Sequence, residues 1–125
     1  MSFKRRKGLF ELLIKNVKII GENEITDGFV RTANGKITEV GKTAREAENE
    51  EVIDGNGKYL SPGFIDLHVH GGGGYSALGT PDDIVKMATA HMNYGTTSIL
   101  PTTLAAPIAQ LKTALLNIKE AKRIC

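Results

Sequence analysis

Residues 62–70 read PGFIDLHVH, and this stretch decides the fold. The Pro-Gly pair ends the segment before it, and residues 64–70 have the β-branched and apolar character of a strand. Successive side chains of a strand point to opposite faces, so the stretch separates into a polar set and an apolar set. The polar set is Asp66, His68 and His70, and the apolar set, which we expect to lie under helices, is Ile65, Leu67 and Val69.

Beyond this strand, helix and strand signals alternate. Four glycines at 71–74 lead to TPDD at 80–83, which has the N-cap threonine, N1 proline and acidic first turn of a helix. We expect this helix to end near Gly95, with a strand at 97–100 and a second helix from Pro107. The second helix is expected to bury Ile108, Leu111, Leu115 and Ile118. The order strand–helix–strand–helix predicts an α/β fold with a parallel sheet covered by helices.

The residues before the strand predict a small antiparallel β-unit. Residues 12–20 and 28–33 read as strands, and 36–40 alternates polar and apolar residues. Asn34-Gly35 between the last two predicts a hairpin, because both residues tolerate positive φ. The charged stretch 43–51 reads as a loop. Residues 54–57, DGNG, predict a turn, and a short strand is expected at 58–60.

Composition excludes several classes of protein. The 125 residues carry 16 Lys+Arg and 14 Asp+Glu, a formal charge of +2, which is too small to indicate nucleic acid as the main partner. No apolar run approaches the roughly 20 residues of a membrane-spanning helix. Cys125 is the single cysteine, so an internal disulfide and a cysteine-based zinc site are excluded. Without an apolar segment typical of a signal peptide, the chain is expected to be cytoplasmic.

His68 and His70 are the candidate metal ligands. Their side chains are expected about 6.6 Å apart along one face of the strand, close enough to converge on one divalent ion. Asp66 would accept the second ring N–H of a ligating histidine. Two histidines spaced like this on a strand are often surface or packing residues rather than metal ligands. Here the pair ends an apolar strand and is followed directly by four glycines, which favours a metal site. His91 lies on the apolar face of its helix and is expected to be a hydrogen-bonded packing residue.

The loops around the histidines offer further candidates. The tetraglycine, including Gly71 and Gly72, has neither the lysine of a P-loop nor the spacing of a dinucleotide site, so we expect a flexible loop that admits a metal. Thr102 and Thr103 end the second strand, where they either line the site or satisfy loop backbone.

Several stretches together resemble a known family. Residues 62–70 are similar to the first barrel strand of the amidohydrolase superfamily. Residues 71–75 (GGGGY), 79–81 (GTP), His91 and 95–104 (GTTSILPTTL) narrow the resemblance to the N-acetylglucosamine-6-phosphate deacetylase family. Residues 13–16 (LIKN) resemble the opening of that family's small β-domain. The resemblance implies a (β/α)₈ barrel, which takes about 250 residues, beside a β-sandwich built from both chain ends.

The resemblance also implies a chemistry. In that family a bound metal activates water, which attacks the acetamide carbonyl of an amino-sugar phosphate. Carried over, His68 and His70 are metal ligands, with zinc or iron as the expected ion. A glutamate ligand, two further histidines and the catalytic aspartate of the family would lie beyond Cys125. The complete enzyme is expected to be a homodimer, with no nucleic-acid or membrane partner.

Length then sets the expected organisation. Residues 1–11 are expected to be a basic extension, with Leu9 as a possible true start; 12–61 part of the β-sandwich domain; and 62–125 two of the eight β/α units. Such a fragment is expected to be inactive by itself. One alternative is a fragment of a dihydroorotase-like or hydantoinase-like enzyme acting on cyclic amides. The other is a non-catalytic remnant or interaction module.

Overall fold

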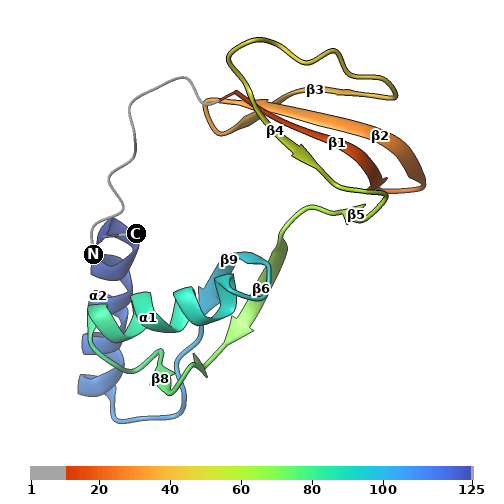
Figure 1. The fold of residues 1–125 in the computed structure, drawn as a ribbon. Coiled ribbons are helices and arrows are strands. Elements are labelled where there is room, and N and C mark those ends of the chain that lie inside the picture. Colours follow the sequence, from red (N-terminus) through yellow and green to blue (C-terminus); the bar gives the residue numbers. More distant parts are fainter. Residues whose placement is uncertain (1–10, 125) are drawn as a thin grey trace. The chain divides into compact units, whose positions relative to one another are not determined.

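The computed structural model describes residues 11–124, and the chain divides into two compact units between Pro62 and Gly63 (Figure 1). The basic extension was expected at residues 1–11, with a start at Leu9, and all of it except Glu11 lies outside the described residues. Cys125 also lies outside them. Of the helices formed by residues 11–124, none is long and apolar enough to cross a membrane.

The first unit is a single five-stranded sheet. Its strands are β1 (Glu11–Ile20), β2 (Ile25–Ala33), β3 (Lys36–Gly41), β4 (Glu51–Asp54) and β5 (Tyr59–Leu60). The order is β3-β2-β1-β4, and β5 also pairs with β1. The predicted hairpin is confirmed: Asn34 and Gly35 have φ of 54° and 73°, and they join the antiparallel strands β2 and β3. The expected antiparallel unit is thus correct for the first three strands.

Strand β4 was not predicted from the sequence, because the charged stretch 43–51 was expected to be a loop. Both β4 and β5 pair parallel to β1, so the sheet is mixed rather than antiparallel. A bulge in β1 at Asn16, whose φ is 54°, accommodates the turn between them. Asn16 donates its side-chain amide to Asp54 at 2.8 Å, and its carbonyl accepts from Gly57 at 2.7 Å. The turn predicted at 54–57 is confirmed.

Arg31 on β2 ties the charged loop of residues 42–50 to the sheet. Its guanidinium donates to Glu50 at 2.8 Å, to the Arg45 carbonyl at 2.7 Å, and also to Glu39 on β3. The Glu50 side chain is fully covered, and the hydrogen bond from Arg31 holds the pKa of its carboxyl below the ordinary value. The ion pair therefore gives order to a stretch that has no regular secondary structure.

The second unit pairs two parallel strands with two helices. Its elements are β6 (Phe64–Val69), β7 (Gly71–Gly72), β8 (Tyr75–Ser76), α1 (Pro81–Met92), β9 (Thr96–Pro101) and α2 (Ile108–Ile124). The predicted order of strand, helix, strand and helix is confirmed, and β6 pairs parallel with β9. Thr80 caps α1 with a capping box to Asp83, as the TPDD stretch indicated. Gly95 follows the helix at φ 94°.

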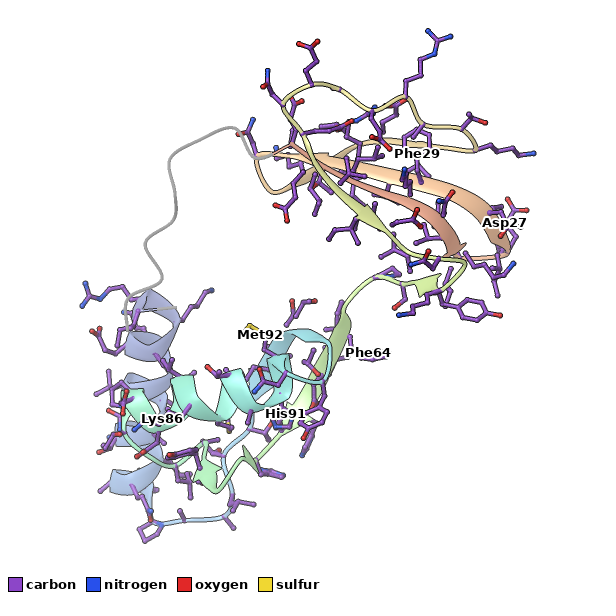
Figure 2. The ribbon with its side chains drawn as sticks, viewed as in Figure 1. Asp27, Phe29, Phe64, Lys86, His91 and Met92 are labelled. Atoms are coloured by element: carbon purple, nitrogen blue, oxygen red, sulfur yellow. The ribbon has the colours of Figure 1, made fainter. Side chains whose placement is uncertain are left out.

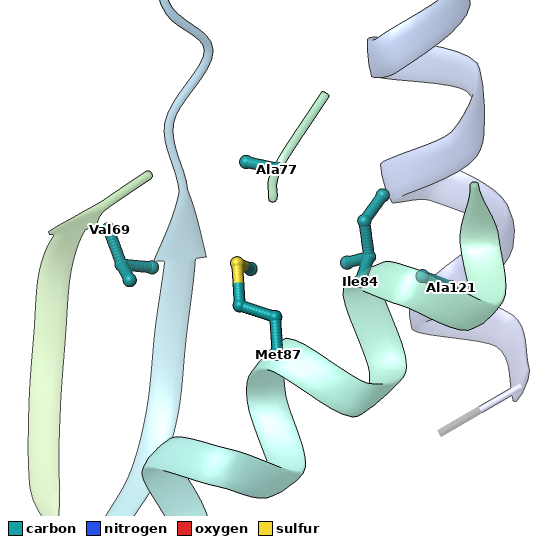
Figure 3. Packing of buried hydrophobic residues seen from close by; sticks show 5 residues of the cluster. All are labelled: Val69, Ala77, Ile84, Met87 and Ala121. Atoms are coloured by element: carbon teal, nitrogen blue, oxygen red, sulfur yellow. The ribbon is translucent and has the colours of Figure 1, made fainter. Parts of the chain in front are cut away.

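The core of the second unit is small and lies between the two helices and the end of β6 (Figure 3). It is formed by Val69, Ala77, Ile84, Met87 and Ala121. Because this core reaches only Val69, the expectation that Ile65 and Leu67 lie under helices is wrong: they are 67% and 68% exposed. The expected stripe of α2 is correct in part. Ile108 and Leu115 are exposed, whereas Ile118 packs against the core as expected, beside the buried Ala114 and Ala121.

Candidate metal centre

His68 and His70 converge at the end of β6. Their Nε2 atoms lie 3.0 Å apart, and the ring centroids are 4.8 Å apart with the planes at 81°. His68 is exposed and His70 is half-buried. The two imidazoles therefore approach one another more closely than the strand repeat of about 6.6 Å, because both rings lean toward the same point.

A backbone carbonyl fixes the orientation of His70. Its Nδ1 lies 2.8 Å from the carbonyl oxygen of Thr102, at the end of β9. A carbonyl only accepts, so Nδ1 carries a proton and, in the neutral ring, Nε2 keeps its lone pair. Metal-ligating histidines are held in the same way, by a hydrogen bond from the ring nitrogen that does not bind the ion.

The geometry of the pair fits two ligands of one divalent ion. Two nitrogens bound tetrahedrally to zinc at about 2.05 Å would lie about 3.3 Å apart, close to the distance between the two Nε2 atoms. Imidazole nitrogen suits zinc and iron. Within residues 11–124, no group of three or more His, Cys, Asp and Glu side chains is placed to hold an ion. The described part of the chain thus brings together two ligands.

Asp66 lies beside the pair but bonds differently from the expectation. Its Oδ1 accepts from the backbone N–H of His68 at 3.0 Å. The pairing of β6 with β9 is irregular between Asp66 and Val69, so this N–H falls in a stretch where the ladder is interrupted. Asp66 therefore supports the backbone of His68, while the ring contact that we expected of it is made to His70 by Thr102.

The glycines after His70 form a hairpin with regular backbone pairing, and the flexibility expected of this segment stays a prediction. Gly71 and Gly72 are the strand β7, which pairs with β8, and Gly73 and Gly74 turn the chain with φ of 59° and 84°. The hairpin is closed by Ala77, whose N–H donates to the His70 carbonyl at 2.8 Å. The four consecutive glycines thus form a turn in which backbone hydrogen bonds join the two ends.

Thr102 and Thr103 are half-buried at the end of β9. The N–H of Thr102 donates to the Val69 carbonyl at 2.7 Å, and its hydroxyl donates to the Leu100 carbonyl at 3.1 Å. Both side chain and backbone of Thr102 thus satisfy main-chain groups, one of the two roles considered for it. Its contact with the His70 ring had no signal in the sequence, because a carbonyl group is common to every residue.

His91, at the end of α1, has the hydrogen-bonded role predicted for it. Its Nε2 lies 3.0 Å from the carbonyl oxygen of Gly71. A shallow pocket beside the ring is lined by Gly72, Gly73, Ala90, His91, Asn93 and Tyr94. The partner of His91 was not foreseen, since the two residues are 20 positions apart in the sequence.

A cation lies over the aromatic residue of the hairpin. The Nζ atom of Lys86 is 5.3 Å from the ring centroid of Tyr75 and 2.5 Å from a carboxylate oxygen of Asp82. The hydrogen bond to Asp82 raises the pKa of Lys86 above its ordinary value. Lys86 therefore links the first turns of α1 to the hairpin.

Known proteins match most of the chain. No protein-family model matches it. N-acetylglucosamine-6-phosphate deacetylase of Bacillus subtilis is 34% identical over 114 residues, covering 89% of this chain and 29% of the relative. Dihydroorotase of the same species is 39% identical over 100 residues, covering 76% of this chain and 22% of the relative. Others that match are named L-hydantoinase and allantoinase.

A solved structure agrees with these relatives. The crystal structure of N-acetylglucosamine-6-phosphate deacetylase from Pasteurella multocida superposes with a TM-score of 0.76 at 29% identity, over 91% of this chain and 31% of that one. Over most of its length the chain is thus similar, in sequence and in α/β fold, to hydrolases that act on amides. The chain spans about a third of the length of the N-acetylglucosamine-6-phosphate deacetylases that it matches.

Proposed function

We propose that the chain is the first part of a metal-dependent deacetylase that hydrolyses N-acetylglucosamine 6-phosphate to glucosamine 6-phosphate and acetate. The observation that carries the proposal is the 3.0 Å approach of the two Nε2 atoms at the carboxyl end of β6. Ligand-binding groups of parallel α/β folds lie at this end of the strands. The matches to deacetylases of amino-sugar phosphates support the substrate.

In this proposal, residues 62–125 form the first two β/α units of a (β/α)₈ barrel, and 12–61 are part of a β-sandwich domain. The parallel pairing of β6 with β9 supports the barrel assignment. We expect the 125-residue chain to be inactive by itself, because His68 and His70 supply only two metal ligands. No residue of this chain is proposed to transfer the proton. A cytoplasmic setting and a homodimer of the complete enzyme stay predictions.

The chain's residues would contribute binding and orientation. His68 and His70 would hold a divalent ion, zinc or iron, through their Nε2 atoms, and Thr102 would keep the Nδ1 proton of His70 in place. The ion would supply Lewis-acid polarisation of the acetamide carbonyl and acidify a water molecule. Asp66 would hold the backbone of His68. Gly71 and Gly72 on one side, and Thr102 and Thr103 on the other, would border the space for substrate.

An amidohydrolase that acts on a cyclic amide is the second candidate, because a dihydroorotase is 39% identical over 100 residues. The downstream sequence distinguishes the two. A glutamate flanked by His-Leu and Gly-Pro would favour the deacetylase, and a lysine suited to carbamylation would favour the cyclic-amide enzyme.

The test begins with the DNA that follows the Cys125 codon, read in all three forward frames. If an open frame continues, the complete protein is assayed for acetate release from N-acetylglucosamine 6-phosphate and, in parallel, for opening of dihydroorotate. The proposal expects acetate release that a chelator abolishes and that falls at least tenfold in His70→Ala. Ring opening without acetate release would favour the second candidate and overturn the first.

A further inference from the structure

His91 connects the last turn of α1 to the backbone next to His70. Its ring Nε2 lies 3.0 Å from the Gly71 carbonyl oxygen, and a carbonyl can only accept, so Nε2 carries the proton. Figure 2 shows the His91 side chain projecting from the end of α1. Gly71 directly follows His70, so this hydrogen bond holds the peptide unit between Gly71 and Gly72, one residue beyond a candidate ligand.

The glycine hairpin is shaped to the surface of α1 at this point. A Cβ atom placed on Gly72 would lie 2.5 Å from Nε2 and 2.8 Å from Cδ2 of His91. A Cβ atom on Gly73 would lie 2.8 Å from the Cβ of Ala90. Real Cβ contacts are longer than this, so the hairpin approaches His91 and Ala90 as closely as it does only because both positions are glycine.

Besides the contact with His68 and the pairing of β7 with β8, three hydrogen bonds hold His70 and Gly71. The His70 carbonyl accepts from Ala77, the His70 ring donates to the Thr102 carbonyl, and the Gly71 carbonyl accepts from His91. The first two use backbone partners, which every residue type would supply. The third depends on the side chain at position 91 alone.

We propose that His91 is a positioning residue for the metal-binding pair: by holding the Gly71 carbonyl, it fixes the backbone from which the His70 ring reaches Thr102 and His68. The inference rests on the proposed metal-binding role of that pair. It makes a specific statement about His70. Without the hydrogen bond from His91 to the Gly71 carbonyl, the His70 ring no longer keeps its proton on Nδ1. The lone pair on its Nε2 is then no longer available to bind an ion.

The test compares three variants of the 125-residue chain with the native protein. His91→Leu removes the donor, and His91→Gln keeps an N–H donor of similar reach. Asn117→Leu is the matched control, because Asn117 makes the same kind of bond, to the Gly79 carbonyl at 2.9 Å, farther along the same loop. Imidazole ¹⁵N–¹H NMR reads the tautomer of each of the three histidines without metal, and a Zn²⁺ titration then gives the affinity.

The native chain, His91→Gln and Asn117→Leu are expected to keep the Nδ1–H tautomer of His70, and His91→Leu to lose it and to bind zinc about tenfold more weakly. Equal tautomer and zinc affinity in His91→Leu and Asn117→Leu would overturn the inference. If His91→Leu does not fold, His91→Asn, whose amide is too short to reach Gly71, takes its place. A native chain that binds no zinc contradicts the proposed function, whereas the metal-free tautomer still decides the role of His91.

Discussion

His68 and His70 place their Nε2 atoms 3.0 Å apart, and within residues 11–124 only His70 is anchored on its other nitrogen, by the Thr102 carbonyl. The two imidazole rings therefore have different roles in the site. His70 is pre-oriented. When its ring is neutral and carries the proton on Nδ1, its Nε2 lone pair accepts a hydrogen bond from Nε2–H of His68 in the absence of an ion. A metal ion would replace that proton, and His68 would then take the Nδ1–H tautomer.

Removal of the α1 cap should destabilise the second unit. The Thr80 hydroxyl accepts from the Asp83 backbone N–H, and the Asp83 carboxylate accepts from the Thr80 N–H at 2.9 Å. Thr80→Ala is expected to cost about 1 kcal/mol in urea unfolding followed by circular dichroism. Thr89→Ala, the same chemical change in mid-helix, should cost less than about 0.5 kcal/mol. Equal losses in the two variants would show that the cap does not stabilise α1.

The ion pair of Arg31 and Glu50 should make the first unit sensitive to acid. The hydrogen bond from Arg31 lowers the pKa of Glu50 in the folded state, and the Ala47 N–H lowers it further. A lowered folded pKa adds stability that is present above the unfolded pKa and is lost as the pH falls through the folded pKa. The melting temperature of Glu50→Gln should therefore lie below the native value at neutral pH, with the gap closing in acid.

Glu39→Gln is the control for this ion pair. Glu39 also accepts from Arg31, but its side chain is 52% exposed, so its loss should lower the melting temperature less than Glu50→Gln does. A gap between native and Glu50→Gln that stays constant from neutral to acidic pH would contradict the role assigned to Glu50.

Gly28 should tolerate no side chain. A Cβ atom there would lie 2.1 Å from the Gly41 carbonyl oxygen, a backbone atom that cannot move without separating β2 from β3. Gly28→Ala is expected to cost about 1–3 kcal/mol in thermal unfolding. Gly35→Asn is the comparison: nothing lies within 4 Å, and asparagine accepts the φ of 73°, so the change should be below about 0.5 kcal/mol. Similar costs would contradict the register of β2 and β3.

Gly72 and His91 should be energetically coupled. Gly72→Ala forces the imidazole away, so its cost should fall by at least about 0.5 kcal/mol when His91 is replaced by alanine. Gly74→Ala serves as control in the same two backgrounds, since its φ is 84° and nothing lies within 4 Å. Its cost, which comes from backbone strain, should not depend on His91. Additive effects of Gly72→Ala and His91→Ala would contradict the close packing of hairpin and helix.

Local signals predicted the local structure. Asn34-Gly35 predicted the hairpin, because a tight turn needs two residues with positive φ. Thr80 and Asp83 predicted the start of α1, because capping involves only neighbouring residues. The histidine pair was also visible, since the strand repeat places both rings on one face. In each case the residues that form the contact lie within three or four positions of one another.

Contacts distant in sequence were missed. Four residues of β4 pair parallel with β1, and nothing in their own sequence shows that partner. In α2 the large side chains of Ile108 and Leu115 were expected on the packing face with Ile118. Only Ile118 of these three packs against the core, beside the small residues Ala114 and Ala121. The Thr102 carbonyl and the Gly71 carbonyl have no sequence signal at all, because every residue carries one.

The metal-binding role of the pair is tested most directly by titrating the chain with Zn²⁺ while the imidazole resonances of its three histidines are followed by NMR. One equivalent should shift the resonances of His68 and His70 and move the His68 proton from Nε2 to Nδ1, with His91 unchanged at its bond to Gly71. His68→Ala and His70→Ala should each abolish the change. Zinc that leaves both resonances in place, or that shifts His91 equally, would contradict a metal site at the end of β6.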